Sequence, residues 1–210
     1  PLLIGESPPI LKVKQLIGRI AQNPDVSVLL FGETGTGKEI AARSIHNETT
    51  GGTGPFLEIN CAAIPEHLLE SELFGYESGA YTGAERTKKG LFELAHEGTL
   101  LLDEIASMSL HLQAKLLKVV EEKAFRRLGG ENSIKASVRI VASSNKDLEG
   151  AVRDREFRED LYYRLNEIQV TLPPLRDRGE DILILTRHFI KEFDQRYNLG
   201  RRVLAETTED

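Results

Sequence analysis

The stretch that decides the fold is an apolar run joined directly to a glycine-rich loop, Val28-Leu29-Leu30-Phe31 and then Gly32-Glu33-Thr34-Gly35-Thr36-Gly37-Lys38-Glu39. The spacing G-x-x-x-x-G-K, between a predicted strand and a helix predicted from Ile40 to Asn47, is typical of a loop that wraps phosphates. Backbone N–H groups and the positive helix end would face the phosphates, and Lys38 would add a mobile cation. We therefore expect a bound triphosphate. A flexible glycine turn is the alternative, but a bare turn needs neither the lysine nor the helix.

Size and composition indicate a soluble globular protein. The chain has 210 residues, of which 40% are apolar and 29% are charged, as is ordinary for such proteins. This length allows one sizeable core and part of a second, smaller unit. The formal net charge of −6 argues against a broad nucleic-acid surface, because phosphate backbones are bound by clustered Lys and Arg. We expect any DNA contact to lie outside this chain.

Cysteine content and the chain start bear on the cellular compartment. Cys61 is the single cysteine, which excludes an internal disulfide and suits a reducing cytoplasm. No apolar run approaches membrane-spanning length, so we expect no membrane association. The start at Pro1 has no basic region ahead of it that would make a secretory signal. We therefore expect a cytoplasmic piece of a longer protein.

Hydrophobic periodicity predicts alternating strands and helices. Apolar residues recur at helical spacing over 8–23, 65–74, 91–95, 109–123 and 181–197. Apolar runs predict core strands over 26–31, 56–60, 99–104, 138–142 and 168–172. A tight turn between short strands is predicted at 126–130. The linker Pro173-Pro174-Leu175-Arg176 leads into a second helical unit, which the polar end 205–210 has too little apolar content to complete.

Polar side chains follow three of the predicted strands. Asp103 and Glu104 end one strand. We expect Asp103 to hold magnesium directly or through water and Glu104 to polarise the water that attacks the γ-phosphate. The alternative is an acidic helix cap. Asn60 and Asn145 lie at strand ends, where α/β sheets place ligand-facing groups, but Asn60 could equally form a turn and Asn145 could cap a helix over 147–153.

One loop combines glycines and small residues with a central aromatic, Gly79-Ala80-Tyr81-Thr82-Gly83-Ala84. Such a loop can move and can present Tyr81 without a supporting core. A merely flexible loop is the alternative.

The stretch 153–164 is dense with charge, and a solvated helix face explains most of its residues. Arg158 and Arg164 differ by six positions, so they need not share one helical face. A bend or a subunit contact could bring both to a neighbour's phosphate, which spacing alone does not establish.

Taken together, these residues resemble the central AAA+ domain of bacterial enhancer-binding proteins, the NtrC-type activators of sigma-54 RNA polymerase. The likeness covers nearly the whole chain. Its most specific feature is the stretch 79–84, which is similar to the family's GAFTGA loop with Tyr81 in place of phenylalanine. Glu72-Leu73-Phe74-Gly75 and Lys89-Gly90-Leu91-Phe92 are flanking matches. The resemblance implies that this loop contacts sigma-54.

The resemblance also implies roles around the nucleotide. The stretch Gly32–Glu39 resembles the family's Walker A, which itself has glutamate after the lysine where other phosphate loops have a Ser or Thr ligand for magnesium. Asp103 and Glu104 resemble Walker B, and Ser144-Asn145 resembles sensor I. The residues expected to bind the nucleotide are Gly32, Glu33, Thr34, Gly35, Thr36, Gly37, Lys38, Glu39, Ile40 and Asn145.

Three further positions match family residues that act on another residue of the site or on the site of the next subunit. Asn60 matches an asparagine that hydrogen-bonds the catalytic glutamate, which would make it a switch for Glu104. Arg158 and Arg164 match a pair of arginine fingers that act on the next subunit. In the family, the lid continues to an arginine called sensor II. This chain ends at Asp210, before that position. The resemblance therefore implies self-association into a ring, expected to be a hexamer.

These observations predict a three-layer α/β/α P-loop AAA+ core with a parallel five-stranded sheet over 1–172 and a truncated helical lid over 173–210. The expected activity is ATP hydrolysis with Mg²⁺, coupled to remodelling of sigma-54 RNA polymerase. DNA would be bound only through a C-terminal domain absent from this chain. Two rival interpretations remain, a module that holds ATP without turnover and an AAA+ remodeller of another clade, such as a replication initiator or a magnesium-chelatase relative. The loop around Tyr81 argues against the second rival.

Overall fold

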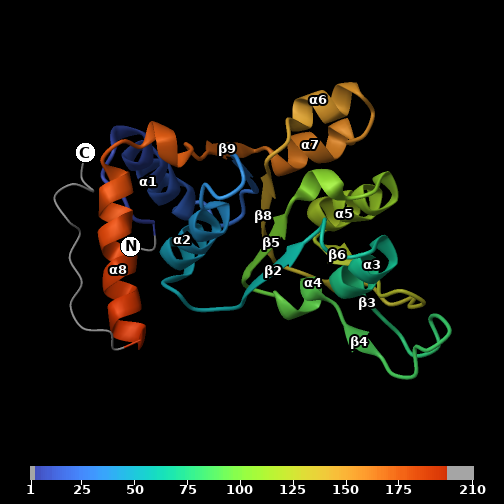
Figure 1. Ribbon diagram of the computed structural model, residues 1–210. Helices are drawn as coiled ribbons and strands as arrows, with labels where there is room; N and C mark the ends of the chain where they lie inside the picture. Colours follow the sequence, from blue (N-terminus) through green and yellow to red (C-terminus); the bar gives the residue numbers. More distant parts are fainter. Residues whose placement is uncertain (1–2, 198–210) are drawn as a thin grey trace.

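A computed structural model of the chain describes residues 3–197 and has a five-stranded sheet between two groups of helices (Figure 1). The sheet strands are β1 (Val28–Phe31), β2 (Phe56–Asn60), β5 (Thr99–Asp103), β8 (Arg139–Ser144) and β9 (Ile168–Thr171). Their order is β2-β5-β8-β1-β9 and every pairing is parallel. The predicted three-layer fold with a parallel five-stranded sheet is confirmed.

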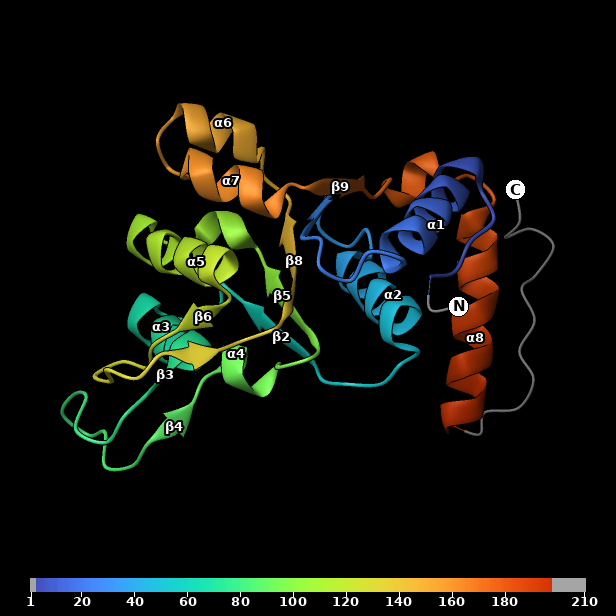
Figure 2. The same ribbon diagram turned by 180° about the vertical axis from the view of Figure 1, so that it is seen from behind.

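Helices flank the sheet on both sides (Figures 1 and 2). One side carries α1 (Pro8–Ala21) and α2 (Lys38–Thr50), and the other carries α3 (Glu66–Phe74), α4 (Leu91–Leu94), α5 (Leu110–Glu122), α6 (Leu148–Arg153) and α7 (Glu159–Leu165). No helix within residues 3–197 has the length and apolarity needed to cross a bilayer.

Alternate residues of the strands feed two separate cores. On β5, Leu101 packs with buried residues of α1 and α2, whereas Leu100 and Leu102 pack with buried residues of α3, α5 and α7. Successive side chains of a strand point to opposite faces, so a strand covered on both faces must be apolar throughout. This requirement explains the continuous apolar runs in the sequence.

The chain continues from the sheet into α8 (Asp181–Tyr197), the helix predicted over the same residues. Its first residue is fully buried and faces the segment before α1. The Asp181 carboxylate accepts hydrogen bonds from the N–H groups of Glu6 at 2.6 Å and Ser7 at 3.0 Å. The division into a core and a lid stays a prediction, and residues 1–2 and 198–210 of these two units lie outside the described part of the chain.

Two short antiparallel hairpins extend from the helical side that carries α3. β3 (Gly75–Tyr76) pairs with β4 (Lys88–Lys89), and β6 (Ala124–Phe125) pairs with β7 (Ile134–Lys135). The predicted short strands flank a connection over 126–133, and the predicted tight turn lies within it, because the N–H of Gly130 donates to the carbonyl of Arg127 at 3.0 Å. The charged stretch 153–164 differs from a single helix face, because α6 ends at Arg153 and α7 begins at Glu159.

Candidate active site

The glycine-rich loop connects β1 to α2 at the carboxyl edge of the sheet. Gly35 and Gly37 have φ angles of 85° and 92°, which only glycine adopts readily. A Cβ atom at either position would meet nothing within 4 Å, so the backbone conformation, and not crowding, requires glycine. Gly37 caps α2 without a side-chain hydrogen bond, which leaves the first N–H groups of the helix without a side-chain acceptor. This arrangement suits a bound anion.

Lys38 is held inside this loop. Its side-chain Nζ donates to the carbonyl oxygens of Gly32 at 2.9 Å and Glu33 at 3.3 Å, and the residue is 8% exposed. Its ammonium group pairs with no carboxylate within residues 3–197. An ammonium has three donors, so one donor remains for a phosphate oxygen.

Asp103, at the end of β5, receives one hydrogen bond on each carboxylate oxygen. Asn60 Nδ2 donates to Oδ2 at 3.0 Å from β2, and the hydroxyl of the fully buried Ser143 donates to Oδ1 from β8. Both donors are neutral, and no ion pair within the described part of the chain offsets the negative charge. Such a carboxylate fits Mg²⁺, which commonly takes one or two carboxylates and completes its shell with phosphates and water.

A magnesium ion here would depend on the nucleotide. The described residues contain no group of three His, Cys, Asp or Glu side chains arranged to hold a metal. Asp103 would therefore supply the protein's share of the ligands. Ser143 was not singled out from the sequence, although a hydroxyl within an otherwise apolar strand is a signal that could have found it.

Asn60 both forms a turn and faces the candidate site, the two roles considered for it from the sequence. Its Oδ1 accepts from the N–H groups of Ala62 at 2.9 Å and Ala63 at 3.1 Å, which forms a turn, while its Nδ2 faces Asp103. The family resemblance predicted a bond to Glu104, but the structure pairs Asn60 with Asp103. The register explains this difference, because Asn60 and Asp103 are directly opposite each other on β2 and β5, and directly opposed residues share a face of the sheet.

Glu104 lies just beyond the strand in a left-handed backbone conformation, with φ 52° and ψ 47°. This conformation costs a non-glycine residue on the order of 1–3 kcal/mol. The residue precedes the 3₁₀ turn Ile105–Ser107 but its side chain makes no capping hydrogen bond there. Among the described residues its carboxylate has no hydrogen-bond partner, which leaves it available to a water molecule.

Asn145 follows β8 and reaches the phosphate loop. Its Nδ2 donates to Thr34 Oγ1 at 3.2 Å. The helix that follows is capped at Asp147, so the alternative of Asn145 as its cap is not observed. A cavity of about 410 Å³ lies beside Asp103 and is lined by Glu39, Asn60 and Asp103, among others. The structure thus brings the predicted loop, carboxylate and amide residues together at one edge.

Arg158 and Arg164 lie at the two ends of α7 and pair with nearby carboxylates. Arg158 makes a two-point contact with Asp160, at 3.0 and 2.7 Å, and this partner raises the pKa of the guanidinium. Arg164 Nε lies 3.4 Å from Glu121 of α5. The two side chains are 41% and 54% exposed, so both remain accessible from outside the subunit.

The loop 79–84 lies beyond the β3–β4 hairpin, away from the main sheet (Figures 1 and 2). It closes on itself, because the N–H of Gly79 donates to the carbonyl of Ala84 at 2.8 Å and the N–H of Ala84 donates to that of Tyr81 at 3.0 Å. Tyr81 is 48% exposed, and its ring meets Tyr76 edge-on with centroids 5.1 Å apart. A hydrogen bond with Tyr76 raises the pKa of Tyr81.

The connection 126–133 of the second hairpin supports the base of this loop. Leu128 donates its N–H to the carbonyl of Gly75 and accepts from the N–H of Glu77, both at 3.0 Å. Arg127 pairs with Glu93 and Glu77 at 2.7 Å each, and its guanidinium lowers the pKa of Glu77. No sequence pattern indicates this contact between Arg127 and Glu77, which are fifty residues apart.

A protein-family model described as the Sigma-54 interaction domain matches residues 3–171. The chain belongs to this family. The sigma-54 interaction domain is 53% identical over 191 residues to the regulatory protein AtoC of Escherichia coli (strain K12), covering 91% of this chain and 41% of that protein. It is 47% identical over 204 residues to the DNA-binding transcriptional regulator NtrC of Proteus hauseri, covering 97% of this chain and 43% of that protein. The chain thus spans less than half the length of these relatives.

The structure of this sigma-54 interaction domain resembles NtrX from Brucella abortus, solved in complex with ADP, with a TM-score of 0.90 and 36% identity over 99% of this chain and 45% of that one. The same protein in complex with ATP gives a TM-score of 0.88 at 36% identity, over 97% of this chain and 44% of that one. These relatives place the domain among the P-loop AAA+ proteins of transcription regulators.

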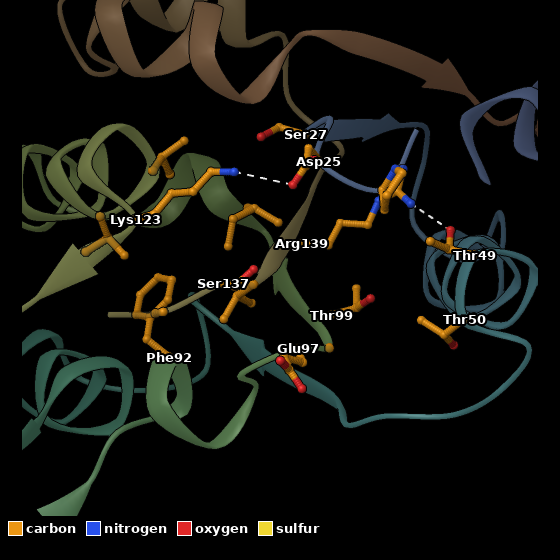
Figure 3. Close-up of a pocket in the computed structure, with 17 residues that line it drawn as sticks. Asp25, Ser27, Thr49, Thr50, Phe92, Glu97, Thr99, Lys123, Ser137 and Arg139 are labelled. Carbon is orange, nitrogen blue, oxygen red and sulfur yellow. Dashed lines mark hydrogen bonds and ion pairs between the residues drawn. The ribbon is translucent and has the colours of Figure 1, made fainter. Parts of the chain in front are cut away.

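A separate cavity of about 300 Å³ lies in the sigma-54 interaction domain at the opposite, amino edge of the sheet (Figure 3). Arg139, at the start of β8, lines it together with Thr49, Lys123 and Asp25. Arg139 donates to Thr49 Oγ1 at 2.6 Å and to the carbonyl of Ile20 at 3.2 Å, so it joins the ends of α1 and α2. Burial lowers the pKa of this guanidinium. The cavity is remote from Asp103 and takes no part in the candidate site.

Proposed function

We propose that this sigma-54 interaction domain hydrolyses ATP in a ring of subunits and uses the energy to remodel the closed complex of sigma-54 RNA polymerase through the loop 79–84. The observation that carries this proposal is the meeting of Lys38, Asp103 and Asn145 at one edge of the sheet, beside the uncapped start of α2. The residues at this edge supply donors for phosphates, a carboxylate for a cation and an amide beside the phosphate loop.

Within one subunit, the N–H groups at the start of α2 and the ammonium of Lys38 would bind the phosphates. Mg²⁺ carried with the nucleotide would neutralise charge on the phosphate oxygens, and Asp103 is the residue that would hold it. Glu104 would accept a proton from the attacking water. Asn145 and Thr34 would respond to the presence of the γ-phosphate, because their hydrogen bond spans the loop that binds it.

The arginine fingers would act between subunits. Arg158 and Arg164 are exposed, and their present partners are surface carboxylates whose ion pairs contribute little. A neighbour's phosphate carries more charge and would displace these partners. An arginine finger contributes roughly three to five powers of ten to turnover in related phosphoryl transfers. Hydrolysis therefore requires assembly, and we expect a hexameric ring.

The coupling to sigma-54 would pass through α3. Asn60 accepts from Ala62 and Ala63 on the path into this helix, and α3 ends at Phe74, directly before the hairpin that carries Tyr81. A nucleotide-dependent change in the Asn60–Asp103 bond would therefore shift α3 and the loop together. The state of the nucleotide site would in this way reach the loop that faces sigma-54.

The direct test is phosphate release measured against protein concentration, with wild type beside Glu104→Ala. A specific rate that rises with concentration and vanishes in the variant supports a ring ATPase with shared sites. A flat rate near zero, together with measurable ATP binding, contradicts the proposal for this chain and favours a module that holds nucleotide without turnover.

A further inference from the structure

Gln113 is a polar residue in the buried face of α5, and none of its surface is exposed. Its Nε2 donates to the carbonyl of Met108 at 2.8 Å and to the carbonyl of Glu156 at 3.1 Å. Its Oε1 accepts from the N–H of Arg158 at 2.8 Å. One side chain thus joins the main chains of two segments that are separate in sequence.

Each of these segments leads to a residue of the proposed mechanism. Met108 directly follows the 3₁₀ turn Ile105–Ser107, which begins next to Glu104. Glu156 belongs to the connection between α6 and α7, and this connection ends at Arg158. Gln113 therefore lies between the segment of the catalytic glutamate and the segment of the first arginine finger.

The connection before Arg158 is tied to α6 through its backbone, because the N–H groups of Glu156 and Phe157 both donate to the carbonyl of Ala151, at 2.8 and 3.1 Å. Arg155 has a left-handed φ of 61°, and Phe157 is buried at 2% exposure, which anchors the chain by packing. The only hydrogen bond that the Arg158 N–H makes in the described structure is to Gln113. Because Arg158 is also the residue that precedes the first turn of α7, this bond links the start of the finger's main chain directly to α5.

We propose that Gln113 is a positioning residue that holds the Arg158 finger in register with the segment following Glu104 of the same subunit. The state of one hydrolysis site is thereby linked to the finger that the subunit presents to the next site. This inference rests on the proposed function, because it requires Arg158 to act on a neighbour.

The first test replaces Gln113 with methionine, which has a similar length and no polar atoms, in the purified chain. We expect ATP turnover to fall at least about tenfold while the KM for ATP stays within about twofold, since the variant's own phosphate loop is intact. Gln113→Leu likewise removes both polar atoms and adds no charge to the buried site, and it should lower turnover in the same way if the methionine variant unfolds. Gln169→Met, on the exposed side of β9, is the matched control and should keep wild-type turnover.

A mixing experiment separates positioning of the finger from general stability. Subunits with Lys38→Ala cannot use ATP but still present intact fingers to their neighbours. Each of the two finger-defective variants, Gln113→Met and Arg158→Ala, is mixed with an excess of Lys38→Ala subunits. We expect the turnover per intact phosphate loop to rise to the same level in both mixtures. Restoration of Arg158→Ala but not of Gln113→Met overturns the inference, as does wild-type turnover in Gln113→Met. Turnover that survives in Arg158→Ala itself overturns the intersubunit finger of the proposed function, and the inference with it.

Discussion

Tyr81 presents a half-exposed ring on a loop that is held mainly by its own hydrogen bonds. Tyr81→Ala should leave ATP turnover within about twofold of wild type, because the residue contacts no part of the nucleotide edge. The same change should abolish capture of sigma-54 in the presence of an ATP transition-state analogue, since a central aromatic anchor typically dominates a small interface. A pull-down with purified sigma-54 measures this effect.

Tyr81→Phe is the matched variant for this experiment. It keeps the ring and removes the hydroxyl that hydrogen-bonds Tyr76. We expect it to bind sigma-54 at least as well as wild type, because the hydroxyl no longer has to be desolvated at the interface. Undiminished binding by Tyr81→Ala would refute the contact role of the loop.

Cys61 is a buried thiol close to the carboxylates of Asp103 and Glu104. Burial, reinforced by the negative charge of Asp103, raises its pKa to about 12, and the residue is 4% exposed. Because the thiolate is the reactive form, Cys61 should react with an aromatic disulfide reagent at pH 8 at least about a hundredfold more slowly in the folded protein than in urea. Rapid labelling of the folded chain would contradict the burial described here.

The position of a single residue at the edge of the sheet could be predicted where the residue is tied to a motif. Lys38, Asp103 and Asn145 are recognisable because a strand end and a glycine loop fix both residue type and place. Gln113 could not be found in this way, because it is one polar residue within an amphipathic helix and its partners are main-chain groups of distant segments. Pairing of Asn60 with Asp103 instead of Glu104 depends on strand register, which no local pattern specifies.

At the scale of elements, the connection 126–133 acts as a support for the loop that carries Tyr81. Gly129 has a φ of 70°, and a Cβ atom there would lie 2.8 Å from the Cβ of Ala80. Gly129→Ala should therefore displace the loop and weaken sigma-54 binding by about tenfold or more, while ATP turnover stays near wild type. Binding titrations with fluorescent sigma-54 provide the measurement.

Gly18→Ala in α1 is a control in which the added methyl group should raise stability and leave sigma-54 binding unchanged. The new Cβ would approach Glu48 at an ordinary 3.6 Å, and alanine favours the middle of a helix over glycine by about 0.5–1 kcal/mol. The variant should be more stable to urea and unchanged in sigma-54 binding. Normal binding by Gly129→Ala would show that the hairpin does not position the loop.

Two elements with a strong pattern were predicted to the residue, whereas the bounds of others, such as α1 and β1, differ from the prediction. β2 and α8 have the expected bounds, because an apolar run of strand length and a helical stripe each leave little choice. The β3–β4 pair was missed, since two-residue strands carry no period, whereas the β6–β7 pair was indicated only by its glycine turn. The charged stretch 153–164 concealed a break between two helices for the same reason, as Phe157 turns inward at a position that charge density does not reveal.

At the scale of the whole molecule, Asp181 fastens the start of α8 to the segment before α1, although Ser7 and Asp181 are 174 residues apart. Hydrogen bonds from Ser7, Glu6 and Arg178 lower the pKa of this fully buried carboxyl from 3.8 to about 2, despite the opposing effect of burial. A depressed folded-state pKa stabilises the fold above the unfolded value, so this contribution of about 2 kcal/mol is present at pH 7 and is lost as the pH falls from about 4 to about 2.

Asp181→Asn should therefore lower the free energy of unfolding at pH 7 by about 2 kcal/mol or more, and the difference from wild type should shrink toward pH 2. Urea unfolding at a series of pH values measures both effects. Asp177→Asn alters an exposed carboxylate nearby and should change stability little. A deficit in Asp181→Asn that is independent of pH would assign the effect to packing.

The sheet divides the interior into two cores that share no buried side chain. The core beneath α1 and α2 includes Ala41 and Ala42, just after the phosphate loop, whereas the core beneath α3, α5 and α7 includes Phe74, directly before the hairpin that carries Tyr81. Substitutions accumulating during evolution in the first core can therefore alter how tightly nucleotide is held while the second core stays unchanged. Nucleotide affinity and the surface around Tyr81 can therefore diverge independently among related domains.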